Sequence, residues 1–129
     1  MIDTRELRIG NIVKGGDYTL NPSTIIKIDT KSATAKSQSS GNDFTSIHGI
    51  SLFEIDLSKY GFTNGYIIHD INLIGKGFNG IDIGLKTVGN GQYEVFIMNE
   101  TKDKYFTIRR ISYLHELQNL IFMLFGVEL

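Results

Sequence analysis

Residues 112–126, which read SYLHELQNLIFMLFG, decide the fold more than any other stretch of this chain. At 100° per residue, the apolar side chains from Leu114 to Phe125 cover an arc of about 200°, wider than the roughly 100° stripe of an ordinary surface helix. Ser112 is suited to cap such a helix, and Gly126 is suited to end it. The segment therefore predicts a C-terminal helix packed on two sides, by a sheet on one side and by the N-terminal strands or a second subunit on the other.

One polar side chain, that of Gln118, falls inside the apolar arc of this helix. A buried amide left unpaired costs on the order of 1–3 kcal/mol. We therefore expect Gln118 to be at least half buried and to bond the backbone of a loop that it holds in place. The remaining arc is expected to form an exposed helix face, made of His115, Glu116, Asn119 and Met123.

Upstream of the helix, residues 66–111 follow the two-residue period of β-strands. Apolar and polar residues alternate in 81–86 and again in 106–108, and Tyr93, Val95 and Ile97 recur at every second position between them. Gly89-Asn90-Gly91 supplies residues that tolerate positive φ in a hairpin turn. Counting a first strand from Tyr66, this region predicts a four-stranded antiparallel meander.

The N-terminal part predicts short strands followed by a short helix. Ile26 and Ile28 are expected on one face of the second strand, with Ile25 on the other. The small polar run 30–43 admits either a flexible binding loop or an edge strand with an ordinary polar turn, and we favour the edge strand. The predicted strands are 7–13 with a break at Gly10, 24–30, 33–36 and 44–50; the helix is 52–60, with Ser51 as its cap and Gly61 as its end.

Composition sets the limits on function. The chain has 129 residues, in the range of a single domain, with 13 basic and 14 acidic side chains. This balance argues against high-charge disorder and against a strongly basic nucleic-acid binder. The absence of cysteine excludes disulfides, thiolate metal sites and a cysteine nucleophile. No apolar run reaches the roughly 20 residues of a membrane span and the start is charged, so we expect a cytoplasmic protein.

Three blocks of the sequence stand out: ELRIGN at 6–11, Leu52 with KYGF at 59–62, and HELQNL at 115–120 together with GVEL at 126–129. These blocks resemble a family of small proteins from prophages and mobile elements of gut-type bacteria. That family opens in the same way, shows Lys-Phe-Gly-Phe in its middle, and closes with a helix His-x-Leu-Gln-Asn-Leu followed by Gly-x-Glu-Leu. Residues 49–52 depart from it, since they read GISL where the family has Pro-Ile-Pro-Leu. The resemblance implies a common source and fold, and it implies no mechanism.

The start of the chain also resembles the small SH3-like barrels, in which Gly-Asn or Gly-Asp precedes a valine-rich strand, as at residues 10–13. Such barrels bind peptides or nucleic acids, but a fold does not fix a function.

Few motifs in the sequence indicate a catalytic, metal or cofactor site. GKGFNG at 75–80 lacks the following helix of a dinucleotide site and predicts a hairpin turn. None of the histidines is paired at metal-ligand spacing on one helix, and a Gly-x-Ser-x-Gly elbow does not occur, so we expect no enzyme, metal or cofactor. The cations expected near one end of the sheet, as a candidate nucleic-acid patch, are Lys102, Lys104, Arg109 and Arg110.

These observations predict an α+β fold with short N-terminal strands, a short helix, an antiparallel meander and a C-terminal helix packed on the sheet. The whole chain, 1–129, is expected to be one domain, with a β-rich, barrel-like part at 1–50 and the helices and meander in 51–129. The function expected is that of a non-enzymatic accessory or interaction protein of a prophage or mobile element, with a protein partner or a second copy and no membrane. The alternative is an SH3-like module that binds nucleic acid.

Overall fold

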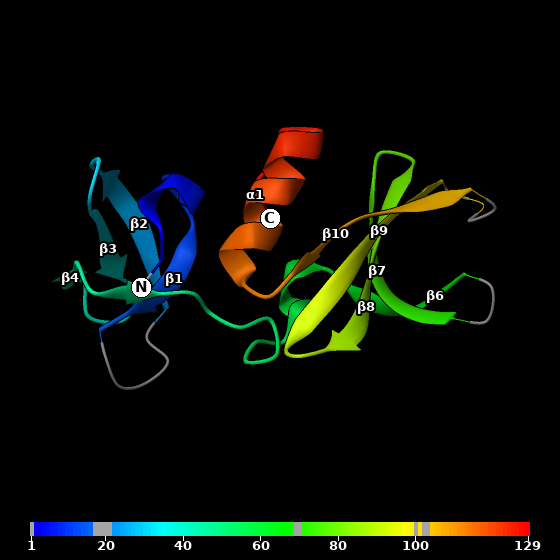
Figure 1. The fold of residues 1–129 in the computed structure, drawn as a ribbon, viewed down its shortest axis with the longest axis horizontal. Coiled ribbons are helices and arrows are strands. Elements are labelled where there is room, and N and C mark those ends of the chain that lie inside the picture. The colour runs from blue at the N-terminus through cyan, green and yellow to red at the C-terminus, as the bar shows by residue number, and fades with distance from the viewer. Residues whose placement is uncertain (1, 17–21, 69–70, 100, 102–103) are drawn as a thin grey trace. The chain divides into compact units, whose positions relative to one another are not determined.

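The computed structural model describes residues 2–16, 22–68, 71–99, 101 and 104–129, and it shows two compact units (Figure 1). Met1–Ser51 and Tyr113–Leu129 form the first unit, and Leu52–Ser112 forms the second. The α+β class is confirmed by two antiparallel sheets and one C-terminal α-helix among these residues. The helix was expected to share a part with the meander, whereas it groups with the N-terminal strands.

The sheet of the first unit has the strand order β4-β3-β2-β1-β5, with all neighbours antiparallel. A short 3₁₀ helix, Thr4–Glu6, precedes it. No ladder among the described residues joins β4 to β5, so the pairing is that of an open sheet. The strands are β1 (Ile12–Gly15), β2 (Pro22–Ile28), β3 (Ala33–Ser37), β4 (Asp43–Phe44) and β5 (Ile47–His48). The core of this sheet consists of Val13, Ile25, Ala33, Ala35 and Ile47.

A β-bulge in β2 changes the faces expected for its isoleucines. The register with β3 shifts between Ile25 and Lys27, which inserts one extra residue and moves the following side chains to the other face. Ile25 is fully buried, Ile28 packs against the same core, and Ile26 is 42 % exposed. The predicted pairing of Ile26 with Ile28 was therefore wrong.

The edges of the first sheet also differ from the prediction. The strand predicted at 33–36 is present as β3, but it is not an edge strand because β4 pairs with it. The single strand predicted at 44–50 forms as two short strands, β4 and β5. The run 30–43 thus contains a strand and a turn.

The helix predicted at 52–60 forms only in its last turn, as the 3₁₀ helix Leu57–Tyr60. Its N-cap is Asp56, whose Oδ1 accepts a hydrogen bond from the Ser58 backbone N–H at 3.0 Å. Ser51 is not the cap, since it forms a β-bridge with Tyr113. Gly61 takes the expected left-handed conformation, with φ of 88°.

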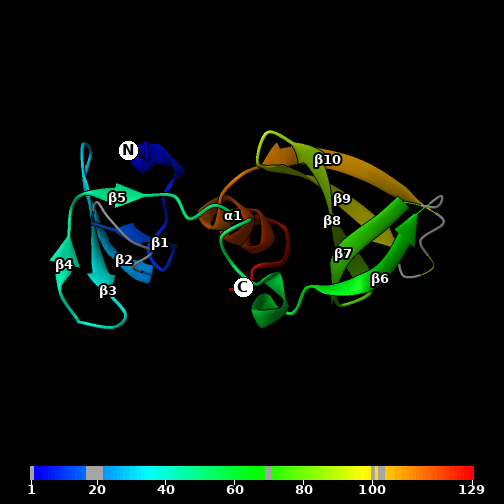
Figure 2. The same cartoon turned by 90° about the horizontal axis from the view of Figure 1, so that it is seen from below.

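The second unit is a curled sheet of five strands in the order β10-β9-β8-β7-β6 (Figure 2). The prediction was four strands. The fifth arises because the region expected to be one strand from Tyr66 onward contributes to two, β6 and the longer β7. Asn79 and Gly80 have positive φ in the turn after β7, which confirms that GKGFNG is a hairpin segment. The strands are β6 (Thr63–Ile68), β7 (Ile71–Phe78), β8 (Ile81–Gly89), β9 (Gln92–Asn99) and β10 (Tyr105–Ile111).

The two faces of this sheet are packed differently. On the concave face, Leu73, Phe96 and Met98 form a buried cluster. Gly84 allows this packing, since a Cβ there would lie 2.5 Å from Met98 Cε. On the other face, the segment before β6 covers one end of the sheet, with the Phe53 ring stacked on that of Tyr93 at 4.7 Å. The first and last residues of the second unit are hydrogen-bonded to each other, since the Leu52 N–H donates to the Ser112 carbonyl at 3.0 Å.

The C-terminal helix α1 spans Leu114–Phe125 and contacts β1. Its N-cap is Tyr113, one residue after the expected Ser112, and the Glu116 carboxylate accepts a hydrogen bond from the Tyr113 backbone N–H at 3.1 Å. Gly126 ends the helix in the left-handed conformation, as expected, with φ of 70°. Within the part of the chain described, no helix is both long and apolar enough to cross a membrane.

Replacing Leu117 with alanine should cost about 2–5 kcal/mol of unfolding free energy, because this side chain is fully buried and its removal leaves a cavity. Met123→Ala is the matched control on the same helix. Met123 is 72 % exposed, so its loss should change the free energy by about 0.5 kcal/mol or less. Urea unfolding followed by circular dichroism measures both, and equal effects would contradict the helix packing.

Candidate functional site

The two terminal sequence blocks bind each other through their side-chain amides. The Asn11 amide N–H donates to the Asn119 Oδ1 at 2.7 Å, and the Asn119 amide donates to the Glu6 carbonyl at 2.7 Å. Asn11 is fully buried, and its own Oδ1 accepts from the Arg8 backbone N–H at 2.7 Å. These contacts join residues more than 100 positions apart in the sequence.

Gln118 completes this network as expected. It is 2 % exposed, and its Oε1 accepts a hydrogen bond from the Ile12 backbone N–H at 2.8 Å. The amide therefore satisfies a donor at the first residue of β1. The side chain ties the helix to the N-terminal sheet, which is a structural role.

Arg8 links the start of the chain to its last residues. Its guanidinium bonds both carboxylate oxygens of Glu128, with Nη2 at 3.1 Å from Oε2, and lies 4.1 Å above the Phe122 ring. The arginine lowers the pKa of Glu128, mainly through the side-chain hydrogen bond. The terminal blocks that carry the family resemblance are thus occupied with one another.

The predicted exposed face of the helix was largely wrong. His115 is 1 % exposed, while Glu116 and Asn119 are half-buried. Only Met123 of that set is exposed. The helical wheel failed here because the N-terminal segment covers the polar side of the first two turns, as the bond from Asn119 to the Glu6 carbonyl shows.

His115 lies in an unusual environment for an imidazole. Neither ring nitrogen has a hydrogen-bond partner among the described residues, and the Glu6 Oε2 lies 3.8 Å from Nε2, beyond hydrogen-bond range. Burial lowers the pKa of His115, against the smaller opposing effects of Glu116 and Glu6. The ring is therefore neutral at pH 7, with one donor and one acceptor nitrogen.

The described members of the predicted cationic patch, Lys104, Arg109 and Arg110, are not brought together on one face. Lys102 lies outside the described residues. Lys104 precedes β10, whereas Arg109 and Arg110 lie near its other end, about 17 Å further along the strand at 3.4 Å per residue. Arg109 pairs in register with Val95 and Arg110 with Glu94, neighbouring positions whose side chains point to opposite faces.

The arginines also have acidic or other partners. Arg110 Nε lies 3.7 Å from the Glu94 carboxylate, which also accepts from the Thr107 hydroxyl at 3.2 Å. Arg109 takes part in a side-chain interaction as well. Lys104, Arg109 and Arg110, the members of the patch that the structure describes, therefore form no continuous cationic surface for phosphates.

An apolar hollow lies instead at the β10 edge of the sheet. Phe106 is the register partner of Ile97, and Ile97 pairs with Ile83, two residues from Ile81, so these side chains share a face. Phe106 is 62 % exposed and Ile81 is 42 % exposed. The hollow has a volume of about 330 Å³ and is lined by Ile81, Ile97, Met98, Asn99, Lys104 and Phe106.

The sequence did not reveal this hollow. Alternation in 106–108 assigned Phe106 to a sheet face, but it could not show that the covering segment, 52–62, reaches only the other end. The signal available was the pair Tyr105-Phe106 beside a polar turn. Tyr105 points to the concave face, with its ring 6.1 Å from that of Phe96, which leaves Phe106 as the exposed aromatic of the convex face.

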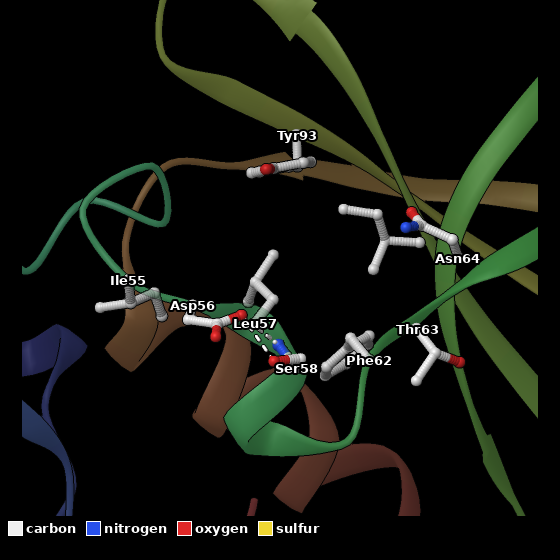
Figure 3. A pocket seen from close by; sticks show the side chains of 9 residues that line it. Ile55, Asp56, Leu57, Ser58, Phe62, Thr63, Asn64 and Tyr93 are labelled. Carbon is white, nitrogen blue, oxygen red and sulfur yellow. Dashed lines mark hydrogen bonds between the residues drawn. The ribbon is translucent and has the colours of Figure 1, made fainter.

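A second hollow, of about 390 Å³, lies between the 3₁₀ helix Leu57–Tyr60 and the convex face. Tyr93 stands there opposite Asp56, Ser58 and Phe62 (Figure 3). The Asp56 carboxylate accepts hydrogen bonds from the Ser58 hydroxyl at 2.6 Å and from its backbone N–H, and these bonds lower the pKa of Asp56. A carboxylate held ionised in a helix cap is unsuited to act as a general acid or base at neutral pH. This arrangement is structural.

No group of three or more metal-ligating side chains occurs among the described residues. The chain also matches no protein-family model, no curated protein and no solved structure. Its function must therefore be argued from its own surfaces.

Gln118→Leu should cost about 1–3 kcal/mol, because the Ile12 N–H would then face an apolar side chain without an acceptor. Gln38→Leu is the matched control, since Gln38 is exposed and its amide lies 3.5 Å from the Thr24 hydroxyl. Urea unfolding measures both variants. If the two lose equal stability, the Gln118 bond does not hold the helix to β1.

Stability should fall as the pH drops below about 6.5, in part because of His115. The pKa of the folded state lies below 6.5, so the unfolded chain binds this proton more readily. The contribution of the neutral ring is fully present above about pH 6.5 and is lost as the pH falls toward the folded pKa. His115→Phe should show a smaller loss over this window; an unchanged loss would assign it to other groups.

Proposed function

We propose that this chain is a non-enzymatic interaction protein of a bacterial mobile element, acting in the cytoplasm, and that it binds an extended segment of a partner protein at β10. The observation that carries the proposal is the apolar hollow at Ile81, Ile97 and Phe106, which opens on the convex face beside an edge strand. The resemblance of both chain ends supports the mobile-element part.

Strand addition suits β10 because its two halves differ. Edge strands are commonly protected from pairing by charges and bulges. The second half of β10 has both, with a bulge between Thr107 and Arg109 and two consecutive arginines. The first half, at Tyr105 and Phe106, carries no charge and is exposed. An added strand would gain backbone hydrogen bonds there and place alternate side chains in the hollow.

The charges around the hollow indicate the composition of the partner segment. Lys104 is exposed and is the charged residue among those that line the hollow. An apolar segment flanked by aspartate or glutamate is complementary to this surface. A second copy of the chain is less suited, because pairing two β10 strands would bring their cations together.

Phe106→Ala should abolish partner binding while changing the unfolding free energy by about 0.5 kcal/mol or less, since the side chain is largely exposed. Met123→Ala, which removes an even more exposed apolar side chain on α1, is the control. Affinity capture of the tagged protein from bacterial lysate, with and without nuclease, is the measurement. We expect a nuclease-resistant partner that wild type and Met123→Ala retain and Phe106→Ala loses.

Three outcomes would contradict this function. Equal capture by Phe106→Ala and wild type would remove the hollow from the interaction. Partners lost with nuclease, and lost in Arg109→Ala with Arg110→Ala, would favour the nucleic-acid module. A concentration-dependent dimer that Phe106→Ala disrupts, measured by sedimentation, would identify the occupant as a second copy.

A further inference from the structure

The hollow beside His115 is separate from the β10 surface and belongs wholly to the first unit. It has a volume of about 180 Å³ and is lined by Ile2, Glu6, His48, Gly49, Tyr113 and His115. A volume of this size suits a small molecule, well below the roughly 300–1,000 Å³ of drug-sized sites.

The walls of this hollow are held in place by backbone geometry. Tyr113 is the N-cap of α1, and its ring lies parallel to that of His115, with centroids 5.6 Å apart and 12° between the planes. Gly49 permits this position, because a Cβ there would lie 2.6 Å from the Tyr113 Cδ1. The aromatic wall therefore packs directly against backbone.

The charges of the lining residues distinguish cationic from anionic ligands. The six lining residues include a carboxylate, two imidazoles and a tyrosine ring, and no lysine or arginine. His115 is 1 % exposed, with no hydrogen-bond partner for either nitrogen among the described residues. A buried imidazole in this state needs a polar partner, because buried polar groups are almost always hydrogen-bonded.

We infer that this hollow binds a small organic cation of the amine class. Its ammonium N–H groups would donate to the Glu6 carboxylate and to the acceptor nitrogen of His115. The Tyr113 ring would supply a cation–π surface. An anion is disfavoured, because it would face the Glu6 carboxylate with no cationic side chain in the lining.

The test uses the full-length protein and methylammonium chloride as the probe. Two-dimensional spectra of the histidine side-chain nitrogens should show a saturable shift of the His115 signals. Sodium acetate at the same ionic strength is the matched anionic probe and should leave these signals unchanged. Tetramethylammonium has no N–H donors, so its weaker binding would measure the share due to hydrogen bonds.

Variants place the ligand in the hollow. Glu6→Gln keeps the shape of an exposed side chain and removes its charge, so methylammonium affinity should fall about tenfold or more, as expected for a charge-assisted hydrogen bond. Glu128→Gln is the control, since that carboxylate bonds Arg8 and does not line the hollow. It should bind like wild type.

Several results would overturn the inference. These are the absence of a saturable shift with methylammonium, an equal response to acetate, and an unchanged affinity in Glu6→Gln. His115→Phe should remain folded and lose the methylammonium response, read from the Gly49 backbone signal. If that variant unfolds, the comparison of Glu6→Gln with Glu128→Gln still decides the question.

Discussion

The hydrogen bonds of Gln118 and Asn119 are the constraint on which the first unit depends. These adjacent amides leave one helix and satisfy backbone groups at Ile12 and Glu6, while Asn11 bonds back to Asn119. These bonds tie the N-terminal strands and the segment before them to the C-terminal helix. Because the contacts span the whole sequence, the first unit cannot finish folding until its C-terminal helix is present, which favours slow folding.

The same constraint accounts for several polar side chains of the terminal sequence blocks. Glu6, Arg8 and Asn11 from one end meet Gln118, Asn119 and Glu128 from the other. Several of their polar atoms bond one another or nearby backbone, whereas Arg8 Nε is buried without a hydrogen-bond partner among the described residues. The candidate binding surfaces are the edge of the second sheet and the hollow beside His115, and Glu6 and His115 of these same blocks line that hollow.

Local rules of sequence predicted most of the elements and some of their ends. The helix, the left-handed glycines at 61 and 126, the Gly-Asn-Gly turn and the burial of Gln118 all follow from short-range patterns. The bulge in β2 and the division of 66–78 into two strands did not, because both depend on pairing with a neighbouring strand. His115 was misplaced for a related reason: a helical wheel contains no information on which distant segment covers its polar side.

The candidate sites were less predictable than the fold. Adjacent cations in the sequence suggested a patch, but a strand separates its ends by several ångströms per residue and sends neighbouring side chains to opposite faces. Phe106 became exposed because the segment that covers the convex face ends before reaching it. Such an exposed aromatic differs from a core aromatic only in what packs over it, and alternation alone does not record that.

The bond between Leu52 N–H and the Ser112 carbonyl has a further consequence for the architecture. The second unit leaves and re-enters the chain at neighbouring positions, so it is topologically a single long loop of the first. A different domain could be inserted at this position if its two ends lay about 5 Å apart, the spacing of paired strands. Recombination at two points of the gene could therefore exchange the entire β10 surface while leaving the hydrogen bonds of Gln118 and Asn119 to Ile12 and Glu6 in place.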